Sequence, residues 1–242
     1  MFDKLFDLYI WKARVLVAIL VSLPVLALIP WLAALVQWQA SPWLANSLVG
    51  AAVVALAALV VRHFGVLAQE ELVREWEALP TTLVMRWSDG TRSTAWKERM
   101  HRLVQERLGL ALCSATEEAR DPAEADRRIC DAFDRIRHEV WGKRDLPSHA
   151  ANVDYGFARN LYGCRWLWWG LSAGGLAAGV IVPVVTESPF PTAGIAACTL
   201  LAIVVPLVEW RLVRSHARHC AERYAEHAWE HLEHMEHGQA TR

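Results

Sequence analysis

Two uninterrupted apolar stretches near the N-terminus decide the fold: VLVAILVSLPVLALIPWLAALV at 15–36 and LANSLVGAAVVALAALVV at 44–61. Neither contains an ionisable side chain, and each is close to the ~20 residues with which a helix crosses ~30 Å of hydrocarbon. Two later stretches have the same character, one from Trp166 to Val185 and one from Ala193 to Val208. The sequence therefore predicts four transmembrane helices, because a soluble domain of this size would rarely need four such stretches.

The four predicted spans form two hairpins, because the links Gln37 to Trp43 and Thr186 to Thr192 are short. The expected fold class is all-α. The chain divides into an N-terminal segment with the first hairpin (1–61), a cytoplasmic helical insert (62–165), the second hairpin (166–208) and a cytoplasmic helical tail (209–242).

The orientation follows from the basic residues beside the spans. Lysine and arginine lie beside the spans at the ends opposite the hairpin tips: Lys4, Lys12, Arg14, Arg62, Arg159, Arg165, Arg211, Arg214 and Arg218. Neither hairpin tip contains either residue type. Since basic flanks stay in the cytoplasm, we expect a multi-pass protein of the bacterial cytoplasmic (inner) membrane, with both termini and the insert inside.

The insert has as many acidic as basic residues, and a phosphate-binding surface would need an excess of positive charge. This balance disfavours a nucleic-acid partner. A helix is expected to continue the second span to Glu77 and to end at Pro80, followed by an extended connector at 81–87. Further helices are expected from Ser93 to Leu108 and, after the cap Asp121 and Pro122, to Trp141.

The cysteines are dispersed, at Cys113, Cys130, Cys164, Cys198 and Cys220. An odd number without CxxC spacing does not indicate a disulfide framework. The first apolar stretch is also too long for a cleavable signal peptide, and a second one follows it at once.

The tail is expected to be helical from Val208 to about His237. One face carries mostly small and apolar residues: Ala217, Ala221, Tyr224, Ala228, Leu232 and Met235. A flanking stripe carries His216, Cys220, His227, His231 and His234. The apolar face predicts packing, and the stripe is expected to lie near solvent.

Three interpretations of the histidine stripe remain open: a solvated helix face, weak binding of Zn²⁺ or Ni²⁺, and a response to pH. His227 and His231 are one turn apart, but a closed zinc site needs four ligands. Cys220 is too far along the same helix, so His101, His138 or a second protomer would have to complete the site. No metal site is therefore predicted, and the HxxEH match at 227–231 is attributed to chance.

Two other patterns precede or lie within the third span. The segment Tyr155–Asn160, YGFARN, fits either a turn that aims the span or a lipid-headgroup or gating segment. Gly170 with Gly174, and Gly175 with Gly179, form small-xxx-small pairs that allow close helix approach, either to the fourth span or to a second copy. Pro24 and Pro30 are expected to kink the first span.

Three segments, Leu79–Thr82, Asp121-Pro122 and the YGFxRN pattern between Asn152 and Asn160, resemble a group of uncharacterised bacterial four-span membrane proteins. That resemblance implies no activity. The layout of four spans with a cytosolic insert is also similar to membrane effectors of bacterial antiviral systems.

The sequence contains no P-loop, dinucleotide-binding glycine motif or nucleophile–base pair, so no enzyme, catalytic residue or cofactor is predicted. Transport is disfavoured because the spans lack ionisable groups. We expect a non-enzymatic membrane scaffold or sensor, with membrane lipid and a cytoplasmic protein as partners. The alternative is an oligomeric pore or membrane-disrupting effector that assembles through the third span.

Overall fold

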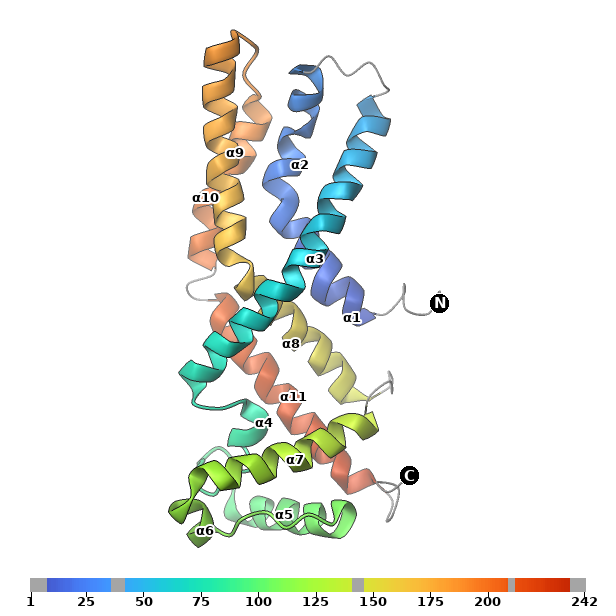
Figure 1. Ribbon diagram of the computed structural model, residues 1–242, viewed down its shortest axis with the longest axis vertical. Coiled ribbons are helices and arrows are strands. Elements are labelled where there is room, and N and C mark those ends of the chain that lie inside the picture. Colours follow the sequence, from blue (N-terminus) through green and yellow to red (C-terminus); the bar gives the residue numbers. More distant parts are fainter. Residues whose placement is uncertain (1–7, 36–41, 141–145, 209–211, 236–242) are drawn as a thin grey trace. The chain divides into compact units, whose positions relative to one another are not determined.

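The computed structural model describes residues 8–35, 42–140, 146–208 and 212–235, and these residues are all-helical apart from turns and short loops (Figure 1). They form two compact units. Unit 1 contains Met1–Glu70 and Gly156–Ala217, and unit 2 contains Glu71–Tyr155 and Arg218–Arg242.

Unit 1 is built from the apolar helices. They are the π-helix η2 (Trp11–Leu16) running into α2 (Val17–Leu35), the first part of α3 (Pro42–Trp76), the end of α8 (Pro147–Gly163), α9 (Arg165–Thr186) and α10 (Thr192–Val208). A short helix α1 (Leu8–Ile10) precedes η2. Helices α2, α9 and α10 pack against one another (Figure 1).

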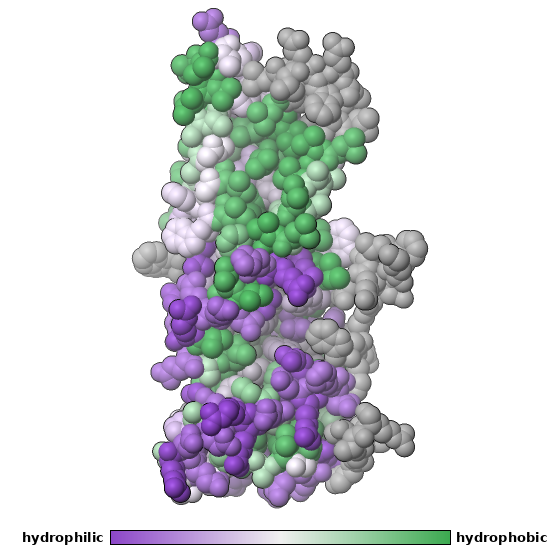
Figure 2. Space-filling model, viewed as in Figure 1, coloured by the Kyte–Doolittle hydropathy of each residue, from purple (hydrophilic) through white to green (hydrophobic). Residues whose placement is uncertain are grey.

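Three helical segments are long and apolar enough to cross a membrane: Trp11–Leu32, Ser47–Leu83 and Arg165–Thr186. The apolar helix Thr192–Leu207 is shorter. Figure 2 shows hydrophobic side chains over most of the visible face of the unit 1 helices. The protein is therefore a helical protein with three candidate transmembrane helices, and the fourth crossing is a proposal argued below.

Glycines set the packing inside unit 1. A Cβ on Gly175 would lie 2.9 Å from the Cys198 sulfur, and one on Gly179 would lie 2.9 Å from a side-chain carbon of Ile195. Both values are too short for real Cβ contacts, so these two glycines allow α9 to approach α10 closely. Gly170 and Gly174 are different, because a Cβ on either would meet nothing within 4 Å.

Unit 2 contains the end of α3, the start of α8, and α4 (Pro80–Leu83), α5 (Thr94–Leu108), α6 (Ala115–Arg120), α7 (Pro122–Val140) and α11 (Arg214–His234) from Arg218 on. Local signals fix the helix ends. Ser93 caps α5, and Gly109 ends it with φ 66°. Ser114 and Glu117 form a capping box at α6. The Glu124 amide donates to the Asp121 carboxylate at 3.0 Å, which confirms the predicted start of α7.

Two expectations differ from the structure, and a third lies partly outside the described residues. Residues 81–87 are not an extended connector, because Pro80 occupies the first turn of α4 and the amides of Thr82 and Leu83 donate to the Leu79 carbonyl. The second span continues as helix only to Trp76, and Glu77 breaks it with φ 70°. The tail helix is described from Arg214 to His234, so its predicted link to Val208 lies partly outside the described residues.

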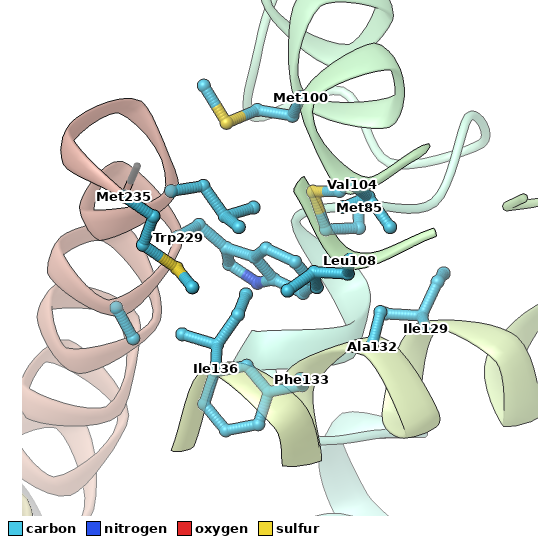
Figure 3. Close-up of a cluster of buried hydrophobic side chains, with 12 residues drawn as sticks. Met85, Met100, Val104, Leu108, Ile129, Ala132, Phe133, Ile136, Trp229 and Met235 are labelled. Carbon is cyan, nitrogen blue, oxygen red and sulfur yellow. The ribbon is translucent and has the colours of Figure 1, made fainter. Parts of the chain in front are cut away.

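The core of unit 2 is shared by the insert and the tail. Trp229 of α11 is fully buried, and its ring lies 5.6 Å from that of Phe133 in α7. Figure 3 shows the indole at the centre of the cluster, with side chains from α5, α7 and α11 around it. The cluster comprises Met85, Met100, Val104, Leu108, Ile129, Ala132, Phe133, Ile136, Ala228, Trp229, Leu232 and Met235.

Polar contacts also fasten the tail to the insert. The Trp229 indole N–H donates to the Thr81 carbonyl at 2.8 Å. Arg92 pairs with Glu226, and Arg99 pairs with Glu233 at 2.5 Å. The tail is therefore a structural element of unit 2, as its apolar face predicted, and its buried residues include Ala221, Ala228, Leu232 and Met235.

Candidate functional site

The turn Arg86–Asp89, here called the clasped turn, is held by two buried charged side chains. Lys97 is 2% exposed, and its Nζ donates to the carbonyls of Arg86 at 2.5 Å, Trp87 at 3.4 Å and Asp89. Lysine is rarely buried to this degree without partners. Here three backbone carbonyls take the place of water around the ammonium group.

A buried carboxylate holds the same turn from its amide side. Glu118 is 6% exposed, and its two carboxylate oxygens accept from the backbone amides of Trp87 at 2.8 Å and Ser88 at 2.9 Å. Hydrogen bonds to an ionised group are about twice as strong as neutral ones. The peptide groups of the turn are thus fixed between opposite charges supplied by α5 and α6.

Side chains of the clasped turn are anchored as well. Arg86 makes a bidentate pair with Asp126 at 2.7 and 2.6 Å, and this hydrogen bonding raises the pKa of the Arg86 guanidinium. The Trp87 indole donates to the Cys113 carbonyl at 2.8 Å and lies 4.6 Å from the His101 ring. Only the outer edge of the turn is open, where Ser88 and Gly90 are exposed.

The clasped turn is held in place by buried charges of opposite sign. Backbone carbonyls of the turn accept from the Lys97 ammonium, and backbone amides of the turn donate to the Glu118 carboxylate. What the arrangement provides is a rigid edge at the surface of unit 2. Sequence reasoning missed this site, because Lys97 and Glu118 are indistinguishable in sequence from the solvated charges around them.

His101 packs against Trp87 of the clasped turn and is expected to make unit 2 less stable in acid. Its Nε2 hydrogen-bonds the Met85 carbonyl at 3.0 Å, and burial lowers the pKa of the imidazole below its usual 6.5. The folded state therefore binds fewer protons than the unfolded state below about pH 6.5. Unfolding of unit 2 measured by denaturant titration should show stability that falls as the pH drops through this window.

His101→Gln should reduce that pH dependence, because the glutamine amide keeps a donor without a titratable group. His138→Gln is the matched control, since His138 is exposed on α7. An unchanged pH profile in His101→Gln would contradict the assignment.

The histidine stripe of the tail does not come together as one site. Cys220 is 2% exposed, whereas His216 and His234 are exposed and His227 lies 3.4 Å from Glu230. Within the residues that the structure describes, no three His, Cys, Asp or Glu side chains gather as metal ligands. His101 and His138, the proposed helpers from the insert, lie respectively beneath the clasped turn and on the surface of α7.

The YGFARN segment is helical, within α8, and its polar end is a second site in unit 1. Asn160 is 1% exposed, and its Nδ2 donates to the Ala13 carbonyl in η2 at 2.7 Å. Arg159 donates to the side chains of Gln69 at 2.6 Å and Asn160 at 3.2 Å. The segment thus joins η2 and α3 to α8, so it is more than the amphipathic turn that was one of the two expectations.

Close backbone approach at this junction predicts a sensitive glycine. A Cβ on Gly65 would overlap the Asn160 amide, lying 2.9 Å from its Cγ. Gly65→Ala should therefore cost about 1–3 kcal/mol through overpacking, measured by thermal unfolding of the full chain in detergent. Gly174→Ala, at an open position in α9, should be nearly neutral. Equal effects of the two substitutions would contradict the packing assigned to Gly65.

Sequence gave no means of finding the Asn160–Ala13 contact, because the two residues are 147 positions apart. The only signal was a polar amide just ahead of an apolar span.

Comparisons of the chain with protein-family models, with curated proteins and with solved structures find no match.

Proposed function

We propose that this protein is a four-pass, non-enzymatic scaffold or sensor of the bacterial cytoplasmic membrane, which presents unit 2 to a cytoplasmic protein partner. The main support for this proposal is that insert and tail share one hydrophobic core around Trp229. Residues before and after the second hairpin fold into one domain, and a single domain occupies a single side of a membrane.

This core supports a fourth crossing. If α9 crosses the membrane, the chain must return before α11 joins α5 and α7, and α10 is the apolar helix between them. Its 17 residues span about 25 Å at 1.5 Å per residue, slightly less than the ~30 Å hydrocarbon thickness. The same reasoning pairs α2 with α3 as the first hairpin and puts the start of α2 on the same side of the membrane as the insert.

Orientation rests on the basic flanks. Within the described residues, Lys12 and Arg14 precede the first apolar span, Arg62 follows the second and Arg165 precedes the third. The tip of the second hairpin offers Glu187 but no basic residue. The positive-inside rule then places unit 2 in the cytoplasm.

The presented surface includes the clasped turn. A preformed edge loses little conformational entropy on binding, which favours recognition. A photo-crosslinking residue at Ser88 should give a protein adduct in cells, and the same residue at Arg102, exposed on α5, should not. The Ser88 adduct should disappear when Lys97→Met loosens the turn. Adducts of equal yield at both positions, or a Ser88 adduct that survives Lys97→Met, would overturn this assignment.

The rival function, an oligomeric pore or membrane-disrupting effector, is favoured by one observation. Gly170 and Gly174 are exposed on α9, and a Cβ built on either would meet nothing within 4 Å, which leaves room for another helix. Membrane potential after expression separates the two functions. Depolarisation that Gly170→Leu or Gly174→Leu abolishes would support the pore and contradict the scaffold.

A further inference from the structure

The first span begins with a helical irregularity that has a specific partner. Trp11–Leu16 is a π-helix, whose backbone bonds join residues five apart, and α2 resumes the normal spacing of four. Where the spacing changes, one carbonyl is skipped by the amide ladder. The Asn160 amide donates to the Ala13 carbonyl of this segment from another helix, and the bond is buried.

The contact depends on two close approaches by glycine. Gly65 of α3 leaves room for the Asn160 amide, and Gly156 of α8 lies against the Tyr9 ring, where a Cβ would be 2.8 Å from a ring carbon. Tyr9 precedes the π-helix by two residues. The same junction therefore contacts the first span at two places, at Tyr9 before the irregularity and at Ala13 within it.

A π-helix and an α-helix of the same residues place their flanks differently. The extra residue per turn changes the angular position of everything before it by about 100°, one residue's rotation at 3.6 residues per turn. Return of Trp11–Leu16 to α geometry would satisfy the skipped carbonyl within the helix. It would also rotate Tyr9 away from Gly156.

We propose that Trp11–Leu16 is a register switch of the first span, held in its π form by Asn160 and read out by the docking of Tyr9 on Gly156. The inference deepens the proposed sensor function, on which its biological meaning rests. The helices that contact the switch, α3 and α8, both continue without a break into unit 2. A movement of either helix at the switch would therefore be transmitted along the same helix into unit 2.

Fluorine NMR of the purified full chain tests the switch independently of any partner. The chain has four tyrosines, so 3-fluorotyrosine labelling gives few resonances, and Tyr9→Phe assigns that of Tyr9. Asn160→Leu should shift the ratio of docked to undocked Tyr9 by roughly ten- to a hundredfold, the effect of losing one buried hydrogen bond. Asn152→Leu, at a half-buried position in α8, is the control and should leave Tyr9 docked.

A one-residue deletion distinguishes a register switch from a local contact. Deleting Val15 lets the segment be α-helical while both flanks keep their positions. In that background Tyr9 should stay docked, and Asn160→Leu should no longer move its resonance. The proposal is wrong if Asn160→Leu leaves the Tyr9 resonance unchanged while the other three tyrosines keep their native shifts. It is also wrong if Asn160→Leu still moves Tyr9 in the deletion background. Neither result bears on whether unit 2 binds a partner.

Discussion

Trp229→Ala is expected to destabilise unit 2 by about 3–5 kcal/mol, the range for deleting a buried aromatic side chain. The indole is fully buried at the centre of the core, and its N–H satisfies the Thr81 carbonyl at 2.8 Å. Alanine would remove contacts with both α5 and α7 and leave that carbonyl without its donor. Hydrogen exchange of the α5 and α7 amides in the full-length protein measures the loss directly.

Arg223→Ala serves as the control for this prediction, because Arg223 lies on the exposed face of the same helix. Its effect should stay within about 0.5 kcal/mol. If exchange in α5 and α7 were no faster in Trp229→Ala than in Arg223→Ala, the tail would not be part of the unit 2 core.

Lys97→Met is expected to cost about 3–5 kcal/mol, because the ammonium donates to three carbonyls and a hydrogen bond to a charged group contributes about 1.5–3 kcal/mol. Methionine matches the lysine side chain as far as Cε, so the effect reports mainly the lost ammonium. Three carbonyls of the clasped turn would lose their charged donor. Urea unfolding followed by pulse proteolysis of the full chain measures this loss.

Arg102→Met, an exposed cation on the same helix, should have little effect in that assay. A further readout localises the damage. Hydrogen exchange at the Trp87 and Ser88 amides, which donate to Glu118, should accelerate in Lys97→Met before the rest of unit 2 opens. A loss below about 1 kcal/mol would mean that the ammonium does not hold the turn.

The sequence predicted the apolar helices well, because a stretch of membrane length without charged residues is a strong, local signal. Helices α9 and α10 begin one residue before the expected spans and end within a residue of their expected ends. The caps at Ser93 and Asp121 also located α5 and α7, since capping depends on a few neighbouring side chains.

The sites were much harder to predict, because they depend on contacts far apart in sequence. Trp229 lies between His227 and Glu230 in the HxxEH match, and the sequence does not mark it as the residue that joins tail and insert. Its partner, the Thr81 carbonyl, is far away in sequence. Lys97 and Glu118 are 21 positions apart, and their shared target, the clasped turn, comes before both. Asn160 contacts a carbonyl of a π-helix that no sequence pattern predicted.

The central claim is that insert and tail lie on one side of the membrane, and cysteine accessibility tests it most directly. Among the native thiols only Cys130 is exposed, while Cys113 and Cys220 are buried, so Cys130 reports the insert. His219→Cys reports the exposed face of the tail, and Ser188→Cys reports the second hairpin tip. Each is retained as the single reactive cysteine and treated with an impermeant maleimide in intact cells.

Labelling from outside is expected only at position 188, with Cys130 and position 219 labelled after the membrane is permeabilised. Labelling of Cys130 and position 219 from opposite sides would contradict the central claim, because no single core around Trp229 could then form.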